Sequence, residues 1–172
     1  MTDLQFELSN RKHMKRMLNI SHIYRMIIIL LLALWLPVTI DKILDFSAFQ
    51  SGILNQPFPD LLGYILIYLL PVLEIATVAT LVVSRFQKLG LTMSISLLTA
   101  FSTYIAIALL GTWEQLPCGC GSVINGMNWM QHLILNLTFL ILSVWGLYLW
   151  NKQRGSKVGD DTVAGGSAKR RL

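Results

Sequence analysis

Residues 61–83, LLGYILIYLLPVLEIATVATLVV, decide the class of this protein. The stretch is apolar almost throughout, and Glu74 is its only acidic or basic residue. A transmembrane α-helix needs about 17 to 25 consecutive, mostly apolar residues. The stretch therefore predicts a helix that crosses a lipid bilayer with one ionisable acid inside it.

Three further runs have the same character, and they cover residues 23–40, 91–110 and 130–149. The whole chain is 54% hydrophobic and only 13% charged, with a mean hydropathy of +0.59, whereas a soluble domain is about 25% charged. The first run is longer than the apolar region of a signal peptide and lacks a following small-residue cleavage site, so we expect it to be retained. The predicted fold is all-α, an integral membrane bundle of four transmembrane helices.

The membrane domain is expected to cover residues 22–150. A basic segment, 1–21, precedes it, and residues 151–172 are expected to form a disordered basic tail. The net charge of +5 comes from residues that flank the spans, whereas a nucleic-acid-binding domain carries its basic residues on one folded face. The composition therefore argues against nucleic acid as a partner and makes the lipid bilayer the expected surroundings.

Topology follows from the basic residues, because loops rich in Lys and Arg stay cytoplasmic. Nearly all of the 14 Lys and Arg residues lie in three segments: before the first run (with Arg25 at its beginning), between the second and third runs, and after the fourth run. Lys42 is the one exception. Both termini are therefore predicted to be cytoplasmic, and the loops 41–60 and 111–129 to face outward. The second loop, with its two cysteines, is therefore predicted to be extracytoplasmic.

The first outward loop contains a helical pattern. In residues 41–54, DKILDFSAFQSGIL, the apolar residues Ile43, Phe46, Phe49 and Ile53 recur at helical spacing. This pattern predicts a short amphipathic helix that lies on the outer membrane surface.

Small hydroxyl residues form a stripe in the third run. Thr92, Ser96, Thr99 and Thr103 recur every three or four residues and so share one helix face. Because small hydroxyl residues let membrane helices approach closely and form hydrogen bonds, the stripe is expected to pack inside the bundle. A polar path for a substrate is the alternative.

The only two cysteines, Cys118 and Cys120, form a C-x-C motif in the second outward loop, where disulfides can persist. Closing so small a ring gives little chain-entropy stabilisation, and strained, exposed disulfides are the oxidising, labile ones. The motif therefore favours thiol–disulfide exchange. A local structural disulfide, two unreactive thiols, or a metal site with His132 are the alternatives, although structural zinc sites usually have four ligands.

Three further side chains are candidates for chemistry. His132 could lower the pKa of a thiol or move protons to it, and Asn136 lies on the same helix face. Glu74 is costly inside a bilayer, which favours a proton-relay role, contact with a quinone, or a bond to another helix. Lys42 could stabilise a thiolate, or form an interfacial ion pair together with Asp41.

These segments resemble the MauE/DoxX-like membrane proteins, specifically the MauE type in its Bacteroidetes form. The resemblance covers residues 25–150 and rests on three segments, DKILDFSAF (41–49), LLPVLEIATVATLV (69–82) and PCGCGSVINGMNWMQHLILNLTF (117–139). It implies a four-helix bundle related to the vitamin K epoxide reductase and DsbB folds. It also implies that Cys118 and Cys120 are a redox pair, and that Lys42, Glu74, His132 and Asn136 are the other family residues.

The resemblance further implies a thioredoxin-like partner and a role in forming or isomerising disulfides during methylamine dehydrogenase maturation. Two features depart from the family. Gly121 and Ser122 follow Cys120 where the common motif continues Phe-Gly, and the second cysteine pair that quinone-linked disulfide formers generally use is absent from the sequence.

The function predicted is membrane-bound thiol–disulfide redox chemistry at the periplasmic face of a bacterial inner membrane. The candidate catalytic residues are Cys118, Cys120, His132, Glu74 and Lys42. The pair would exchange with a thioredoxin-like partner or a secreted substrate, and electrons would pass to or from a carrier such as quinone. The alternatives are a non-catalytic scaffold for a thioredoxin-like or respiratory partner, and a small-solute transporter.

Overall fold

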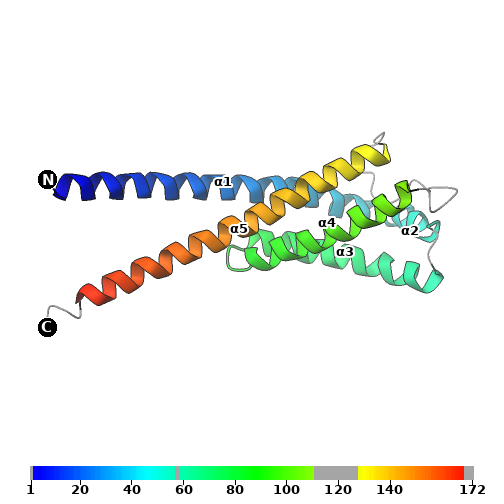
Figure 1. Cartoon of the computed structure of the whole chain (residues 1–172). Coiled ribbons are helices and arrows are strands. Elements are labelled where there is room, and N and C mark those ends of the chain that lie inside the picture. Colours follow the sequence, from blue (N-terminus) through cyan, green and yellow to red (C-terminus); the bar gives the residue numbers. More distant parts are fainter. Residues whose placement is uncertain (1, 57–58, 111–127, 169–172) are drawn as a thin grey trace.

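The computed structural model describes residues 2–56, 59–110 and 128–168, and these residues form five helices (Figure 1). They are α1 (Thr2–Leu44), α2 (Phe46–Leu54), α3 (Asp60–Val82), α4 (Gln87–Leu109) and α5 (Trp129–Ala168). Four of them contain a stretch long and apolar enough to cross a membrane, namely Leu18–Leu44, Asp60–Val82, Gln87–Leu109 and Trp129–Arg154. The predicted all-α architecture with four spans is confirmed, and the protein is a multi-pass membrane protein.

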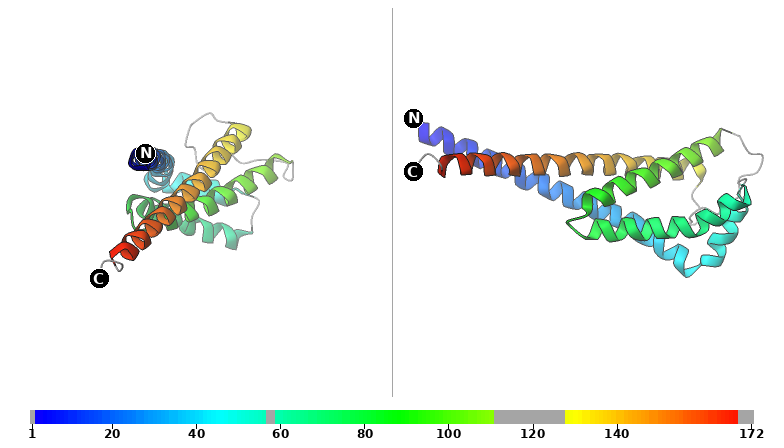
Figure 2. Two further views of the ribbon diagram at one scale, coloured as in Figure 1. Left: turned by 60° about the vertical axis from the view of Figure 1, so that its left-hand side comes forward. Right: turned by 90° about the horizontal axis from the view of Figure 1, so that it is seen from below.

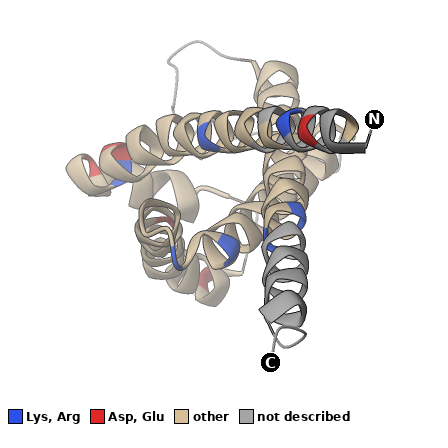
Figure 3. Ribbon diagram, turned by 90° about the vertical axis from the view of Figure 1, so that its left-hand side faces the viewer, with Lys and Arg blue, Asp and Glu red and all other residues tan. Residues whose placement is uncertain are grey.

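Both termini lie at one end of the molecule (Figure 1). The opposite end is formed by α2, the beginning of α3, the end of α4 and the beginning of α5 (Figure 2). Basic residues lie on α1, at the α3–α4 turn and after the apolar part of α5, and a view from the terminal end shows them in blue (Figure 3). An even number of spans places both termini on one side, but which side is cytoplasmic stays a prediction.

A chain of hydrogen bonds links three of the spanning helices. The indole N–H of Trp35 on α1 donates to the Ser94 hydroxyl of α4 at 2.9 Å, and the hydroxyls of Ser94 and Ser143 are 3.1 Å apart. Ser143, on α5, donates its only proton to the carbonyl of Phe139 at 2.9 Å. Ser94 is therefore the donor to Ser143, and the chain runs from α1 through α4 to α5.

Apolar packing surrounds this chain. The core draws on all four spanning helices, with Leu31, Leu81, Leu91, Leu98 and Leu149 among its buried residues. Many large apolar side chains on the opposite helix faces are exposed. This pattern is expected of a bundle whose outer surface meets lipid, because lipid tails solvate such side chains as well as a protein interior does.

The short helix predicted in the first outward loop is present as α2. The Asp45 side chain accepts a hydrogen bond from the backbone N–H of Ala48 at 3.2 Å and so caps the helix. Phe49 and Ile53 pack against Ile67 of α3, so the buried face of α2 lies on the bundle. The expected four-residue stripe is only partly realised, because residues 41–44 belong to α1 and the chain bends at Asp45.

The expectation that the hydroxyl stripe of α4 packs inside the bundle is wrong. The four side chains, those of Thr92, Ser96, Thr99 and Thr103, are all exposed. Each hydroxyl donates a hydrogen bond to the backbone carbonyl of the residue four positions earlier. These local bonds satisfy the hydroxyls without a partner helix. The buried hydroxyls of α4 are those of Ser94 and Ser102.

The end helices extend beyond the predicted spans. Helix α1 begins at Thr2, so the segment 1–21 continues the first span as one helix from residue 2. Helix α5 continues to Ala168, through residues for which the sequence predicted a disordered tail, while residues 169–172 lie outside the described part. Lys152, Gln153 and Arg154, which lie beyond the predicted end of the span at residue 149, are good helix formers and continue the helix of the membrane segment.

Candidate polar site in the bundle interior

Two of the predicted site residues meet inside the bundle. The ammonium of Lys42, near the end of α1, forms an ion pair and hydrogen bond with Oε1 of Glu74 on α3. The side chains are 7% and 0% exposed, respectively. The Lys42 nitrogen also lies 5.4 Å from the ring centre of Phe49 and 5.7 Å from that of Phe101. Aromatic faces therefore supplement the carboxylate as neighbours of the positive charge.

This arrangement answers the alternatives that the sequence left open for both residues. Lys42 does form an ion pair, but its partner is Glu74 in the interior rather than a group at the membrane surface, where Asp41 is exposed. Glu74 does bond another helix, but through Lys42 rather than through the hydroxyl stripe. Although Lys42 lies near the end of α1, its side chain is buried against Glu74 of α3 and Phe49 of α2. The start of α3 and the helix α2 extend past the end of α1 (Figure 2).

Four buried polar atoms have no hydrogen-bond partner among the described residues. They are Thr39 Oγ1, Glu74 Oε2, Ser102 Oγ and Asn136 Nδ2. Each comes from a different spanning helix. Buried polar groups are normally paired, so a group of unpaired ones is a reason to expect a ligand, a water or a functional role.

The helix contacts place these atoms at similar heights in the bundle. Helices α4 and α5 run antiparallel (Figure 1) and touch at Ser94 and Ser143. Ser102 is eight residues beyond Ser94, and Asn136 is seven residues before Ser143. At ~1.5 Å per residue, both lie roughly 11 Å from the serine contact, toward the end away from the termini. Lys42 is at a matching height, because its nitrogen lies beside the Phe101 ring.

His132 lies above this level, at the beginning of α5. Asn128 caps the helix: its side chain accepts from the N–H of Gln131 at 2.8 Å, and the Gln131 side chain accepts from the N–H of Asn128 at 3.1 Å. This reciprocal pair is a capping box and fixes where the helix begins. His132 is partly buried, and it interacts electrostatically with Lys42.

The structure does not test the placement of the two cysteines. Cys118 and Cys120 lie outside the described residues, so their placement stays a prediction. The described chain on either side ends at Leu110, after α4, and resumes at Asn128, before α5. Both points lie at the end of the bundle away from the termini (Figure 2). The alternative of a metal bound by the two cysteines and His132 is likewise untested.

Residues 20–149 match the family model of methylamine utilisation protein MauE. The chain belongs to the MauE family. The matched range covers the second and third spans entirely, most of the first and the last, and every candidate site residue, among them Cys118 and Cys120. Searches of curated proteins and of solved structures gave no match.

In this MauE protein, sequence reasoning found the charged members of the site and missed two of its polar ones. Thr39 precedes Lys42 by three residues and so shares its helix face, which is a signal that could have been used. Ser102 carried no such signal, because α4 has hydroxyl residues on several faces. Tyr104 adds a further contact nearby, since its hydroxyl donates to the side-chain oxygen of Gln56, after α2.

Proposed function

We propose that this MauE protein is a thiol–disulfide exchange protein of the bacterial inner membrane that works in methylamine utilisation. Its C-x-C pair would face the periplasm and react with a thioredoxin-fold protein or a secreted substrate. The observation that carries the proposal is the buried Lys42–Glu74 ion pair. It lies on the side of the bundle from which the cysteine loop is connected, and its cost inside a membrane argues for a function.

The exchange step needs only the two cysteines and the partner's thiols. When the pair is oxidised, a partner thiolate attacks one sulfur of the Cys118–Cys120 disulfide and a mixed disulfide forms. The partner's second thiolate then displaces the protein sulfur, which leaves a partner disulfide and a reduced pair. The pair has then gained two electrons and two protons. The reverse sequence gives the partner two electrons and two protons.

The buried groups would serve the proton part of this cycle. His132 is the described titratable side chain nearest the beginning of α5, and it can accept or release a proton near neutral pH. The Lys42–Glu74 pair lies below it, with Glu74 Oε2 free to accept a hydrogen bond. These side chains would hold protons between the thiols and the bundle interior.

A membrane quinone would supply the two-electron acceptor or donor that a single cysteine pair requires. The Asn136 amide and the Ser102 hydroxyl suit the carbonyl oxygens of such a ring, because both are buried donors without a partner among the described residues. Ser102 and Asn136 also lie at a similar height in the bundle, as two groups that bind one ligand would.

The test is the reduction potential of the cysteine pair in lipid nanodiscs, measured by the mass shift on thiol alkylation across a series of redox buffers. We expect a potential above ~−300 mV, together with fast exchange with a reduced thioredoxin-fold protein. A pair that stays oxidised well below ~−300 mV would be a structural disulfide and would favour the scaffold alternative.

Two carboxylate variants test the buried groups separately. Glu74→Gln should slow re-oxidation of the pair by coenzyme Q1, a soluble quinone, by about tenfold or more. Asp41→Asn is the matched control, because Asp41 is an exposed carboxylate next to Lys42 in the sequence. Equal re-oxidation rates in the two variants would remove Glu74 from the proposed proton path.

A further inference from the structure

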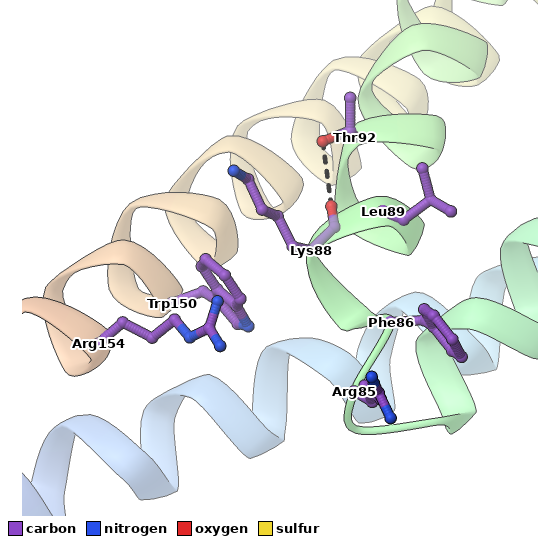
Figure 4. Close-up of a pocket in the computed structure, with 7 residues that line it drawn as sticks. All are labelled: Arg85, Phe86, Lys88, Leu89, Thr92, Trp150 and Arg154. Carbon is purple, nitrogen blue, oxygen red and sulfur yellow. Dashed lines mark hydrogen bonds between the residues drawn. The ribbon is translucent and has the colours of Figure 1, made fainter. Parts of the chain in front are cut away.

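A cavity lies at the other end of the bundle, between the α3–α4 turn and α5 (Figure 4). Its volume is about 290 Å³. The residues that line it are Arg85, Phe86, Lys88, Leu89, Thr92, Trp150 and Arg154. None of them belongs to the polar site described above.

The lining is strongly basic. Arg85, Lys88 and Arg154 contribute three positive charges, and no acidic residue lines the cavity. In the part of the chain that the structure describes, no carboxylate lies within ion-pair distance of these three side chains. An anion in the cavity would therefore meet cations that no described carboxylate neutralises.

Trp150 holds two of these cations in place. The Lys88 nitrogen lies 5.5 Å from the centre of the indole ring, and the Arg154 guanidinium lies 4.8 Å from it. Figure 4 shows Arg154 and Trp150 on α5 facing Lys88 on α4. Stacking on an aromatic face restricts long, flexible side chains and reduces the entropy that they lose when they bind an anion.

The beginning of α4 adds a further attraction for an anion. Phe86, the residue that caps this helix, offers no side-chain hydrogen bond to its first N–H groups. Gln87 does not cap it either, because its side chain accepts from Tyr24 and donates to the carbonyl of Leu81. The N-terminus of a helix carries partial positive charge and free N–H groups, so it favours a phosphate nearby.

The apolar side of the cavity indicates which kind of phosphate fits. Phe86 and Leu89 are each 51% exposed, and they lie where the spans of α3 and α4 meet the turn. Acyl chains can cover such side chains, whereas a free phosphate ion cannot. Basic pockets between transmembrane helices are known binding sites for anionic lipid head groups.

We propose that this cavity binds the head group of one anionic phospholipid from the leaflet on the side of the termini. Arg85, Lys88 and Arg154 hold the phosphate, and Trp150 positions Lys88 and Arg154. The acyl chains run along the exposed faces of Phe86 and Leu89. The site is independent of the cysteine chemistry proposed above.

The experiment is native mass spectrometry of the full chain in detergent, titrated with phosphatidylglycerol or with phosphatidylcholine of the same acyl chains. The wild type should bind one phosphatidylglycerol at least about tenfold more tightly than one phosphatidylcholine. The triple variant R85Q/K88Q/R154Q should lose this preference. The control R11Q/R25Q/K152Q removes the same charge from α1 and α5 outside the cavity, and it should keep the preference within about twofold.

Three results would overturn the proposal. One is equal binding of the two lipids by the wild type, which needs no variant and so does not depend on how a variant folds. Another is an equal loss of preference in the cavity variant and the control variant. The third is displacement of phosphatidylglycerol by millimolar inorganic phosphate, which would make the cavity a site for a free phosphate compound.

Discussion

The buried ion pair is the residue-scale feature that most needs an explanation. Lys42 and Glu74 lose their hydration in the bundle, and the attraction between two buried charges often only balances that loss. Phe49 and Phe101 beside the ammonium add cation–π attraction. In the described part of the chain, Glu74 Oε2 still has no hydrogen-bond partner. If the pair were retained only for stability, both carboxylate oxygens of Glu74 would be expected to accept hydrogen bonds. The unpaired oxygen therefore indicates a functional role.

A double-mutant cycle measures the pair. We expect Lys42→Met or Glu74→Met alone to lower the free energy of unfolding by about 3 kcal/mol, because each leaves an uncompensated buried charge. The double variant Lys42→Met/Glu74→Met should regain most of that loss. The measurement is unfolding in mixed micelles with increasing sodium dodecyl sulfate, followed by loss of helical circular dichroism.

Arg25→Met is the control for the cycle, because Arg25 is an exposed basic residue on α1. It should change the free energy of unfolding by less than about 0.5 kcal/mol. Additive losses in the double variant would mean that Lys42 and Glu74 do not interact in the folded protein, contrary to the structure.

The sequence indicated both Lys42 and Glu74 as candidate site residues, but it did not predict that they contact each other. Glu74 was conspicuous as the only charge in its span, and Lys42 as the only basic residue in an outward segment. Lys42 was placed at the membrane surface because residue counting ended the first span at residue 40. The structure continues α1 to Leu44, and Lys42 near its end contacts Phe49 of α2 and Glu74 of α3. That tertiary arrangement is not encoded in any local pattern.

At the scale of helices, α3 and α4 approach each other very closely at the turn between them. A Cβ atom built on Gly90 would lie 2.8 Å from the backbone nitrogen of Leu81 and 2.9 Å from Oγ1 of Thr80. Backbone atoms cannot move aside as a side-chain end can, so the helices can pack this way only with glycine at position 90. Small residues at such crossings are typical of membrane helices.

Gly90→Ala should therefore destabilise the protein by about 2 kcal/mol, because the α3–α4 turn must open. Gly63→Ala is the matched control, since its added Cβ would lie 3.4 Å from the end of the Leu54 side chain, an ordinary contact. It should be neutral or gain up to about 1 kcal/mol from better helix propensity. The same detergent unfolding assay compares them, and equal effects would contradict the close approach at Gly90.

The hydrogen-bond chain between helices gives a second prediction at this scale. Ser94→Ala removes the acceptor of Trp35 and the donor to Ser143, so it should destabilise the bundle by about 1 kcal/mol. Ser96→Ala, on the exposed face, removes only a bond to its own helix and should change stability by less than about 0.5 kcal/mol. A larger effect at Ser96 than at Ser94 would restore the original assignment of the buried face.

The two hydroxyl faces show why the sequence predicted the helices but not their rotation. The length of an apolar run is enough to locate a span, because loops exposed to water do not contain apolar runs of that length. Helix α4 carries hydroxyl residues around much of its circumference, and each can bond to its own backbone in lipid. Neither face is therefore forbidden to meet lipid, and only packing against Trp35 and Ser143 decides which face turns inward.

At the scale of the whole molecule, the features divide between two ends. The terminal end carries most of the basic residues and the cavity with Trp150 (Figures 3 and 4). The opposite end carries α2, the polar site and the two points from which the cysteine loop is connected (Figure 2). A protein that exchanges electrons on one side of a membrane requires such polarity, so the orientation in the membrane tests the whole scheme.

The chain offers a direct measurement of orientation, because Cys118 and Cys120 are its only cysteines. After mild reduction, a membrane-impermeant maleimide should label wild-type protein in intact spheroplasts, since the loop 111–129 is predicted to face outward. In the C118S/C120S background, a cysteine introduced by Gln5→Cys should be labelled only after the membrane is made permeable. That variant is the matched control, because residue 5 is exposed on α1 near the N-terminus. The reverse labelling pattern would place the cysteines in the reducing cytoplasm, where a stable disulfide rarely forms. Periplasmic exchange would then be impossible, whatever the redox potential of the pair.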